Sequence, residues 1–582
     1  MEAQVQAKTT VQLLRTLVDD PENDTHLKEL KERIKDKDDN SIDEAAYYVK
    51  AKTSQPKLKS PISIFCGILI FSWIWSTLVQ FVVKIFMKIF GPTTWSNYVG
   101  QQTCYPGKIR KPKNLNDLIT AVNDAQQRKI TLRAVGSGHS YSNVAPVFKG
   151  GLLLDPHGMN RVLPIDDSLL KDPQGAGKLF AVESGITIQD LNLALDKKKL
   201  ALANMGAYDG QTIAGAISTG THGTGIGLGP LASSVRAVVI VSGTGTVYQI
   251  EPTNGISDPE KFKYKIQDRT LKQDDEWFNT VLVSMGCTGI IYSYILEVVD
   301  AYYLEERRAH SSWEIVKKDL MFPEKGVFPK VLTDNRHYEV DINPYPVKNV
   351  HSCVIQTKNI SKENKPSGSR GIADWIAGIL AGCPLAEHWL VWALNLWPAV
   401  SPEIINNALN SLVEGHVYID KSYKVLNLGA VNNVKAIAME FSYPVDDNLV
   451  DGIDNLLSIF QDEADKNNWY MAGPFSLRFV AASDAYLAPQ QGRPSCMVEL
   501  DMLLGIETGP QLLTEITRKV QASNPEVRVH WGLDLDTVRK DSLVELYPEL
   551  PKWLKVYAEL NTMGVFDNPL TDRLDISVNL LA

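Results

Sequence analysis

The segment from Asn204 to Gly225 constrains this chain more than any other, because glycine, alanine, serine and threonine fill most of more than twenty positions. Such small side chains cannot build a hydrophobic core, since each buries little apolar surface. They do allow a large flat ligand to lie against the backbone. A surface loop is the alternative, and the interleaved Ile213, Ala214 and Ile217 disfavour it.

Two further glycine-containing segments flank this one. In Thr131–Ser140 a short strand runs into a turn that contains two glycines. Glycines let backbone N–H groups point into a concavity, where these groups bind phosphate oxygens. Tyr141 stands where a GxGxxG motif needs its third glycine, so a Rossmann dinucleotide site is not supported. The third segment, Ser284–Tyr292, continues into a strand-like run over 293–299.

The composition is that of a globular protein with a full core. The chain has 582 residues, of which 44% are hydrophobic and 22% charged, and its net charge is −9. These values exclude a disordered tail protein, a collagen and a polytopic transporter. The acidic balance offers no basic face, so we expect no nucleic-acid partner. The cysteines form no CxxC pair, and we predict no metal site.

The three segments, in this order, resemble the FAD-binding domain of the vanillyl-alcohol oxidase type, and within it the sugar-1,4-lactone oxidases. The resemblance runs from about Cys104 to the C-terminus and includes Val529-His530-Trp531-Gly532 and Gly564–Pro569. It implies an α+β fold, with a two-subdomain FAD-binding (PCMH-type) domain over 96–302. A substrate cap built on an antiparallel sheet and a C-terminal lactone-oxidase-type region would occupy 303–582. The strand-like runs Tyr338–Ile342 and Cys496–Leu500 fit that cap.

By the same resemblance, His139 sits where family oxidases attach FAD covalently through a histidine nitrogen. Imidazole suits this role because it is nucleophilic and largely neutral near pH 7. A histidine that hydrogen-bonds beside a noncovalent flavin is the alternative. The other positions that the resemblance assigns to FAD are Val135, Gly136, Ser137, Gly138, Ser140, Ala207, Thr212, Gly215, Thr219, His222 and Ile291.

The resemblance implies three catalytic positions, Ser476, Arg478 and His530, and two departures from the family pattern. The family carries Glu-x-Arg where this chain has Ser476-Leu477-Arg478, and a lysine after His-Trp-Gly where this chain has Leu533. A lysine beside the flavin would stabilise the negative charge that develops during hydride transfer. Arg478 alone or a shifted His530 could supply that charge. Asp534 and Asp536 are alternative acid–base groups or exposed loop acids.

The resemblance further implies that the chain oxidises a secondary alcohol of a polyhydroxy lactone of the D-arabinono-1,4-lactone type. Hydride passes to FAD, O2 takes the electrons, and an ascorbate-type enediol and H2O2 result. Expected partners are therefore a small lactone or alcohol and O2. Three alternatives remain open: oxidation of another polyol or of a less polar alcohol, a dehydrogenase that passes electrons to a cytochrome, and a flavin-binding pseudoenzyme.

Residues 62–83 contain no charged side chain. Twenty-two helical residues span about 33 Å, enough to cross a hydrocarbon core of about 30 Å. We predict one transmembrane anchor over 60–90 after a soluble charged arm over 1–59. The protein would then contact membrane lipid in a single pass, in a mitochondrial or endoplasmic reticulum membrane. The alternatives are a buried helix and a cleaved signal peptide. Another apolar stretch, 372–400, is interrupted by polar residues, which favours a pair of core helices over a second span.

Overall fold

The computed structural model describes residues 93–368, 384–413, 417–429, 434–534 and 537–578. The predicted arm over 1–59 and the predicted anchor over 60–90 lie outside the described residues. Within the described ranges, no helix is both long and apolar enough to span a membrane.

The first layer of the fold is a three-stranded parallel sheet in the order β3-β5-β4, formed by Lys108–Arg110, Leu152–Leu154 and Leu132–Ala134. Helix α5 (Leu115–Gln127) begins where the Asn114 side chain accepts a hydrogen bond from the amide of Asp117. Its helically spaced apolar residues pack on this sheet and on the second one. A two-stranded ribbon precedes it, β1 (Trp95–Ser96) and β2 (Thr103–Cys104).

The second layer is a six-stranded sheet in the order β11-β10-β9-β12-β7-β6, antiparallel except for the β10–β11 pair. Its strands are β6 (Val162–Leu163), β7 (Leu179–Glu183), β9 (Val235–Val241), β10 (Val247–Glu251), β11 (Thr270–Gln273) and β12 (Ile290–Glu297). The strands β8 (Leu200–Ala201) and β13 (Val299–Asp300) pair separately. The helices are α6 (Ile188–Lys197), α7 (Ile213–Ser218), α8 (Pro259–Lys265) and α9 (Asp275–Leu282).

The third layer is an eight-stranded antiparallel sheet in the order β17-β14-β16-β15-β19-β20-β18-β21. Its strands are β14 (Tyr303–Ser312), β15 (His337–Ile342), β16 (Ser352–Ile360), β17 (Val417–Lys421), β18 (Ala436–Pro444), β19 (Phe475–Val480), β20 (Ser495–Leu503) and β21 (Arg528–Val529). The strands predicted over 338–342 and 496–500 are therefore confirmed as β15 and β20, and so is the α+β fold with an antiparallel cap sheet.

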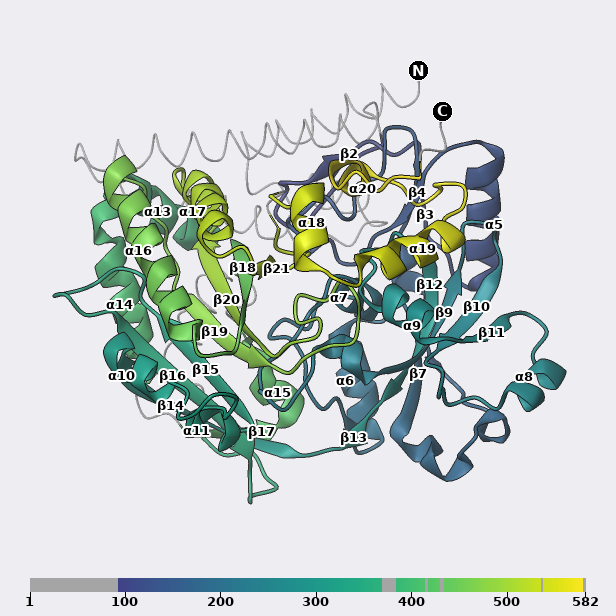
Figure 1. Cartoon of the computed structure of the whole chain (residues 1–582), viewed down its shortest axis with the longest axis horizontal. Coiled ribbons are helices and arrows are strands. Elements are labelled where there is room, and N and C mark those ends of the chain that lie inside the picture. Colours follow the sequence, from purple (N-terminus) through teal and green to yellow (C-terminus); the bar gives the residue numbers. More distant parts are fainter. Residues whose placement is uncertain (1–92, 369–383, 414–416, 430–433, 535–536, 579–582) are drawn as a thin grey trace, which may run out of the picture. The chain divides into compact units, whose positions relative to one another are not determined.

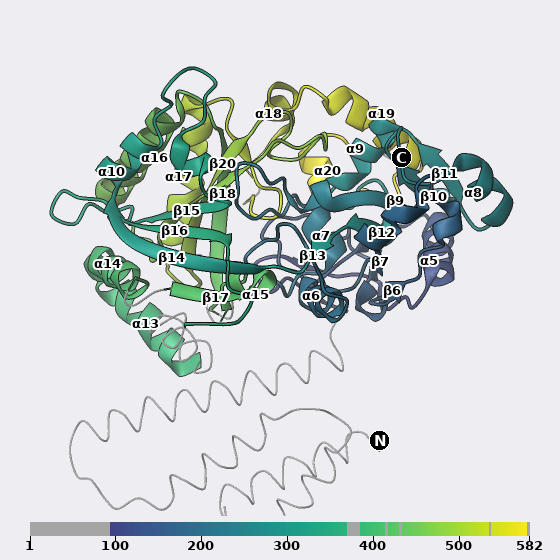
Figure 2. The same ribbon diagram turned by 90° about the horizontal axis from the view of Figure 1, so that it is seen from below.

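One face of this cap sheet is apolar and covered by helices. In β19, the side chains of Phe475, Leu477 and Phe479 are fully buried, whereas the intervening residues point to the other face. Helices α10, α16 and α17 lie on the outer side of the sheet, away from β7 and β12 (Figures 1 and 2). The cap helices are α10 (Trp313–Asp319), α11 (Lys330–Thr333), α13 (Pro384–Leu396), α14 (Ser401–Ser411), α15 (Ser422–Leu426), α16 (Leu449–Asn467) and α17 (Gly509–Ser523).

The apolar stretch 372–400 contains α13, whose tryptophans are largely exposed. Trp389, Trp392 and Trp397 show 53%, 50% and 59% of their surface and contact one another edge to face. The expectation of a core helix pair is therefore wrong for these three side chains. The hydrophobic periodicity of the sequence could not reveal this exposure, because a short apolar helix has the same sequence pattern in a core and on a surface.

The C-terminal helices return to the first two layers. In the chain, helix α19 (Leu550–Leu560) follows α18 (Lys540–Leu546) and precedes α20 (Pro569–Arg573). It packs on α9 (Figure 1). The amide of Leu132 donates to the carbonyl of Val565 at 2.7 Å. The Asn568 side chain donates to the carbonyl of Val144 at 3.0 Å. The end of the chain thus closes against the segment that follows β4.

Candidate active site

The three glycine-containing segments meet around one pocket. The pocket opens to solvent, and side chains and backbone of all three segments line it. Its wall includes ten of the twelve residues predicted to bind FAD: Val135, Gly136, Ser137, Gly138, His139, Ser140, Thr212, Gly215, Thr219 and Ile291. Segments separated by more than 50 positions in the sequence therefore form one concave surface.

Close approach of backbone to side chain explains why glycine stands at two of these positions. A Cβ atom on Gly136 would lie 2.1 Å from Thr212 Oγ1, which no real contact allows. Gly138 has φ +68°, a left-handed conformation that glycine adopts without strain. A side chain at position 136 would therefore displace Thr212, which caps α7 by accepting from the Gly215 amide.

Arg133 fixes the pocket wall from behind. Its side chain is buried, and its Nη1 donates to the carbonyls of Gly286 at 2.8 Å and Phe566 at 3.0 Å. Its Nη2 also bonds to the carbonyl of Val144. One guanidinium thus joins the first glycine segment, the third glycine segment and the C-terminal return. Its N–H groups donate to carbonyls of the protein itself.

The pocket fits a flavin dinucleotide by the chemistry of its wall. Apolar side chains from α5, β5 and β12 line one side, where a flat ring system can pack: Leu118, Leu154, Ile290 and Ile291. On the same wall, Ser184 Oγ and Gln211 Oε1 are buried and have no hydrogen-bond partner. A buried polar atom without a partner costs free energy, so these two atoms are available to a bound polar ligand.

His139 lies at the edge of the pocket between aromatic rings. Its imidazole stacks on Tyr208 with centroids 4.3 Å apart and on Tyr98 at 5.1 Å. Tyr141 lies 6.1 Å away and donates to the carbonyl of Ala436 at the start of β18. Burial lowers the pKa of His139, so the imidazole is neutral near pH 7 and keeps a lone pair.

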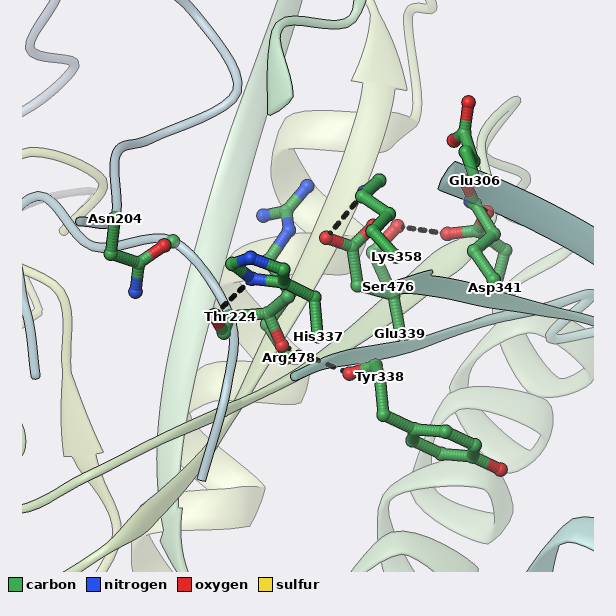
Figure 3. Close-up of polar contacts among 12 residues, drawn as sticks. Asn204, Thr224, Glu306, His337, Tyr338, Glu339, Asp341, Lys358, Ser476 and Arg478 are labelled. Atoms are coloured by element: carbon green, nitrogen blue, oxygen red, sulfur yellow. Dashed lines mark hydrogen bonds and ion pairs between the residues drawn. The ribbon is translucent and has the colours of Figure 1, made fainter. Parts of the chain in front are cut away.

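The cap sheet turns a polar face toward this region. Strand alternation brings charged and polar side chains from five adjacent strands onto one face, with Glu306 and Arg308 from β14, Gln356 and Lys358 from β16, Glu339 and Asp341 from β15, Ser476 and Arg478 from β19, and Glu499 and Asp501 from β20. Figure 3 shows Lys358 reaching Glu339 and Ser476 reaching Asp341, at 2.8 and 2.6 Å. A face of this kind suits a hydroxyl-rich ligand.

Arg478 is the cation at the centre of this face. It forms an ion pair with Glu499, and the pKa of Arg478 is raised: burial lowers it, but Glu499, Glu339 and Glu440 outweigh that effect. Ser476, by contrast, is buried and its hydroxyl is committed to Asp341.

His222, Glu440 and His530 form a buried cluster beside Arg478. Their ligand atoms lie within 4.8 Å of one another, the spacing of a possible metal site. The hydrogen bonds favour an ion pair instead. His222 Nδ1 contacts the carbonyl of Gly223 at 2.8 Å and Nε2 contacts Glu440 Oε1 at 3.1 Å, so both nitrogens face acceptors and require protons.

The neighbouring His530 is neutral. Its Nδ1 accepts from the Gly532 amide at 3.1 Å, and burial lowers the pKa of His530 to about 4. For His222, burial also lowers the pKa, but Glu440 raises it further, so the net direction is upward. The pair is thus an imidazolium and a carboxylate, and the positive charge lies near the position where the family has a lysine and this chain has Leu533.

Two predicted FAD positions lie off the pocket wall. The carbonyl of Ala207 accepts from the Leu428 amide at 3.0 Å, and His222 belongs to the ion pair just described. Asp534 is neither an acid–base group facing the pocket nor an exposed loop acid: it is fully buried and pairs with Arg573 at 2.9 Å. Asp536 lies outside the described residues.

Sequence reasoning missed Glu440, Glu499 and Asp501. A signal existed, because each is an acidic residue in an otherwise apolar strand: Ala436–Phe441 contains Glu440, and Cys496–Met502 contains the other two, two positions apart on one face. It also missed Tyr98 and Tyr208, which no pattern distinguishes from other tyrosines in loops.

Comparison with known proteins agrees with this geometry. The family model for the FAD binding domain matches residues 106–251, and that for D-arabinono-1,4-lactone oxidase matches residues 295–574. The chain is 25% identical over 484 residues to an L-gulono-1,4-lactone dehydrogenase of Mycobacterium tuberculosis, covering 82% of this chain and 98% of the relative. It is equally similar, over the same shares, to an L-gulonolactone oxidase of Bos taurus.

Among solved structures, a cholesterol oxidase from B. sterolicum shares the fold, with a TM-score of 0.62 and 13% identity over 83% of this chain and 96% of that one. A pocket lined by the three glycine-containing segments, a polar cap sheet and two adjoining family matches point to one conclusion. The chain belongs to the aldonolactone oxidase family of FAD-binding, vanillyl-alcohol-oxidase-type enzymes, and it is an FAD-dependent oxidoreductase that acts on CH–OH groups.

Proposed function

We propose that the chain oxidises a secondary alcohol of a polyhydroxy sugar-1,4-lactone of the D-arabinono-1,4-lactone type, with O2 as the acceptor and an ascorbate-type enediol and H2O2 as products. The polar face of the cap sheet carries this proposal, because its row of paired donors and acceptors matches a small ligand with several hydroxyl groups. When bound, FAD accepts the hydride from the alcohol carbon.

The chain's own residues would bind and orient the substrate. Arg478 donates hydrogen bonds to the hydroxyl oxygen that becomes a carbonyl, and its charge favours the negative charge that develops there. Lys358 and Gln356 lie on the same face and hold the carboxylates of Glu339 and Asp341 in place. The imidazolium of His222 adds a second buried positive charge, which stabilises electron gain by the ring in the pocket.

A second candidate acceptor has specific support. The relatives that the chain resembles equally include a dehydrogenase and an oxidase, so the acceptor is another electron carrier in one of them. The alternative to the proposal is therefore the same oxidation with a cytochrome or a dye as acceptor.

The test is anaerobic bleaching of the visible flavin spectrum by a panel of aldonolactones and alditols. We expect a D-arabinono- or L-gulono-type lactone to reduce the flavin fastest, and air to restore the colour with release of H2O2. Reduction by alditols alone would refute the lactone, and colour that returns only with cytochrome c would refute O2 as acceptor. A flavin that no member of the panel reduces would indicate a pseudoenzyme.

We also propose that His139 holds FAD covalently through a ring nitrogen. Its support is a neutral imidazole at the pocket wall, held in orientation by the rings of Tyr98 and Tyr208. After acid precipitation, we expect the yellow colour to stay with the wild-type pellet and to enter the supernatant for His139→Ala.

His157 provides the matched control. It lies beside the same loop, 3.5 Å from Ser137 Oγ, but is more exposed and does not line the pocket. His157→Ala should therefore keep its flavin in the pellet. Wild-type flavin that is released completely on denaturation would contradict the covalent link.

A further inference from the structure

We propose that Glu499 on β20, the cross-strand partner of Ser476, accepts the hydroxyl proton of the substrate. This inference rests on the proposed function, since it concerns the proton of the alcohol that the enzyme oxidises. It assigns a catalytic residue outside the Ser-x-Arg segment that the sequence singled out.

The register of the sheet places the two positions side by side. Ser476 of β19 and Glu499 of β20 are directly paired across the strands and point to the same face. The Cβ atoms of such partners lie about 5 Å apart, so a glutamate at either position extends its carboxylate over the same part of the face. A carboxylate rooted at 499 can therefore occupy the space of one rooted at 476, and it meets the same arginine, Arg478.

Most other carboxylates of this face are already committed. Glu306 pairs with Arg308 at 3.0 Å, Glu339 with Lys358 at 2.8 Å, and Glu440 with His222. Asp341 accepts from Ser476 and Gln356, and burial raises its pKa. Burial and then Glu499 raise the pKa of Asp501 well above its ordinary value.

Arg478–Glu499 is the most accessible of the ion pairs named on this face. Its two side chains keep 16% and 18% of their surface, against 4% and 14% for Lys358–Glu339 and 8% or less for both members of the Glu306–Arg308 and His222–Glu440 pairs. Arg478 bonds to Glu499 through one nitrogen, Nη1, so the rest of the guanidinium can hold the substrate oxygen.

The step balances without a further reactant. The substrate O–H bond breaks and its proton moves to a carboxylate oxygen of Glu499, while the C–H hydrogen leaves with both electrons as hydride to the flavin. The carbon and oxygen then share a double bond. Glu499 afterwards returns its proton to solvent, through the opening that its accessible surface provides.

The test compares three variants in the anaerobic flavin-reduction assay and in equilibrium binding of the lactone. Glu499→Gln should lower the rate of flavin reduction by about 10²–10⁴-fold. It should change lactone affinity far less, and the acidic limb of the pH profile should disappear. The relocated carboxylate Ser476→Glu/Glu499→Ser should recover at least a tenth of the wild-type rate. The control Glu305→Gln, in an Arg–carboxylate pair on the other face of β14, should react like wild type.

The outcomes separate this inference from the proposed function. If wild type reacts with lactones and Glu499→Gln does so within about threefold of it, the inference fails and the proposed function stands. A slow Glu499→Gln variant that retains the acidic limb would assign Glu499 a merely structural role. If wild type neither binds nor oxidises any lactone, both fail together.

Discussion

Arg478→Ala should keep its flavin and lose at least about 10²–10³-fold in the rate of flavin reduction, the cost of removing one preorganised charge from a site of developing negative charge. The guanidinium lies opposite Glu339 in the sheet and pairs with Glu499. Without it, the substrate oxygen loses its donor and Glu499 loses its ion-pair partner. The readout is the anaerobic half-reaction, with flavin absorbance per protein as the measure of cofactor content.

Arg478→Lys is the matched variant, because it keeps the charge but not the planar fork of donors. We expect it to retain the thermal stability of wild type and to react at a rate between those of wild type and Arg478→Ala. If Arg478→Ala reduced its flavin as fast as wild type, the assigned role would be wrong. A loss of flavin in both variants would instead mean that Arg478 supports the fold of the pocket.

The pocket could be predicted from the sequence because its chemistry is local. Glycines at 136 and 138 are needed where the backbone approaches Thr212 or turns left-handed, and such positions leave a visible mark in the sequence. The same is true of the strand at 496–500, whose alternation survives in β20. The resemblance then supplied the order in which these pieces assemble.

The polar face of the cap could not be predicted in the same way, because its members come from five strands spread over some 200 positions. Which residue opposes which depends on register, and a slip of one position would turn every side chain to the other face. The pairing of Ser476 with Glu499 is such a fact. From the sequence alone, Ser476 indicates only that the family's glutamate is absent, because the register that brings Glu499 beside it is not visible there.

The partner of His222 was hidden for a similar reason. Glu440 lies 218 positions away from His222, on β18, and His530 directly follows β21, which pairs with β18. The sequence therefore marked both histidines but not the acid between them.

Glu440→Gln should lower the free energy of unfolding by about 3 kcal/mol near pH 6, the lower end of the range for breaking a buried ion pair. The imidazolium of His222 would lose its counter-ion in a site where both side chains are 3% exposed. Release of the imidazole proton limits the penalty, which is why the lower end applies. The measurement is denaturant unfolding of the holoprotein followed by tryptophan fluorescence.

The pH dependence of the free energy of unfolding tests whether His222 and Glu440 form an ion pair. The pKa of Glu440 is lowered to about 2 (burial raises it, and His222 and then His530 outweigh that), so the stability it contributes is present above pH 4.5 and is lost as pH falls toward 2. The pKa of His222 is raised, so its contribution is complete below pH 6.5 and is lost as pH rises through the raised value. Wild type should therefore lose stability on both sides of pH 4.5–6.5, and Glu440→Gln should show a flatter curve.

Glu549→Gln, which breaks the exposed pair with Lys552, is the control and should cost at most about 1 kcal/mol while keeping the wild-type pH curve. A Glu440→Gln protein with the same pH curve as wild type would show that His222 is neutral. In that case the buried positive charge proposed to compensate for Leu533 would not exist, and Arg478 would have to stabilise the developing negative charge alone.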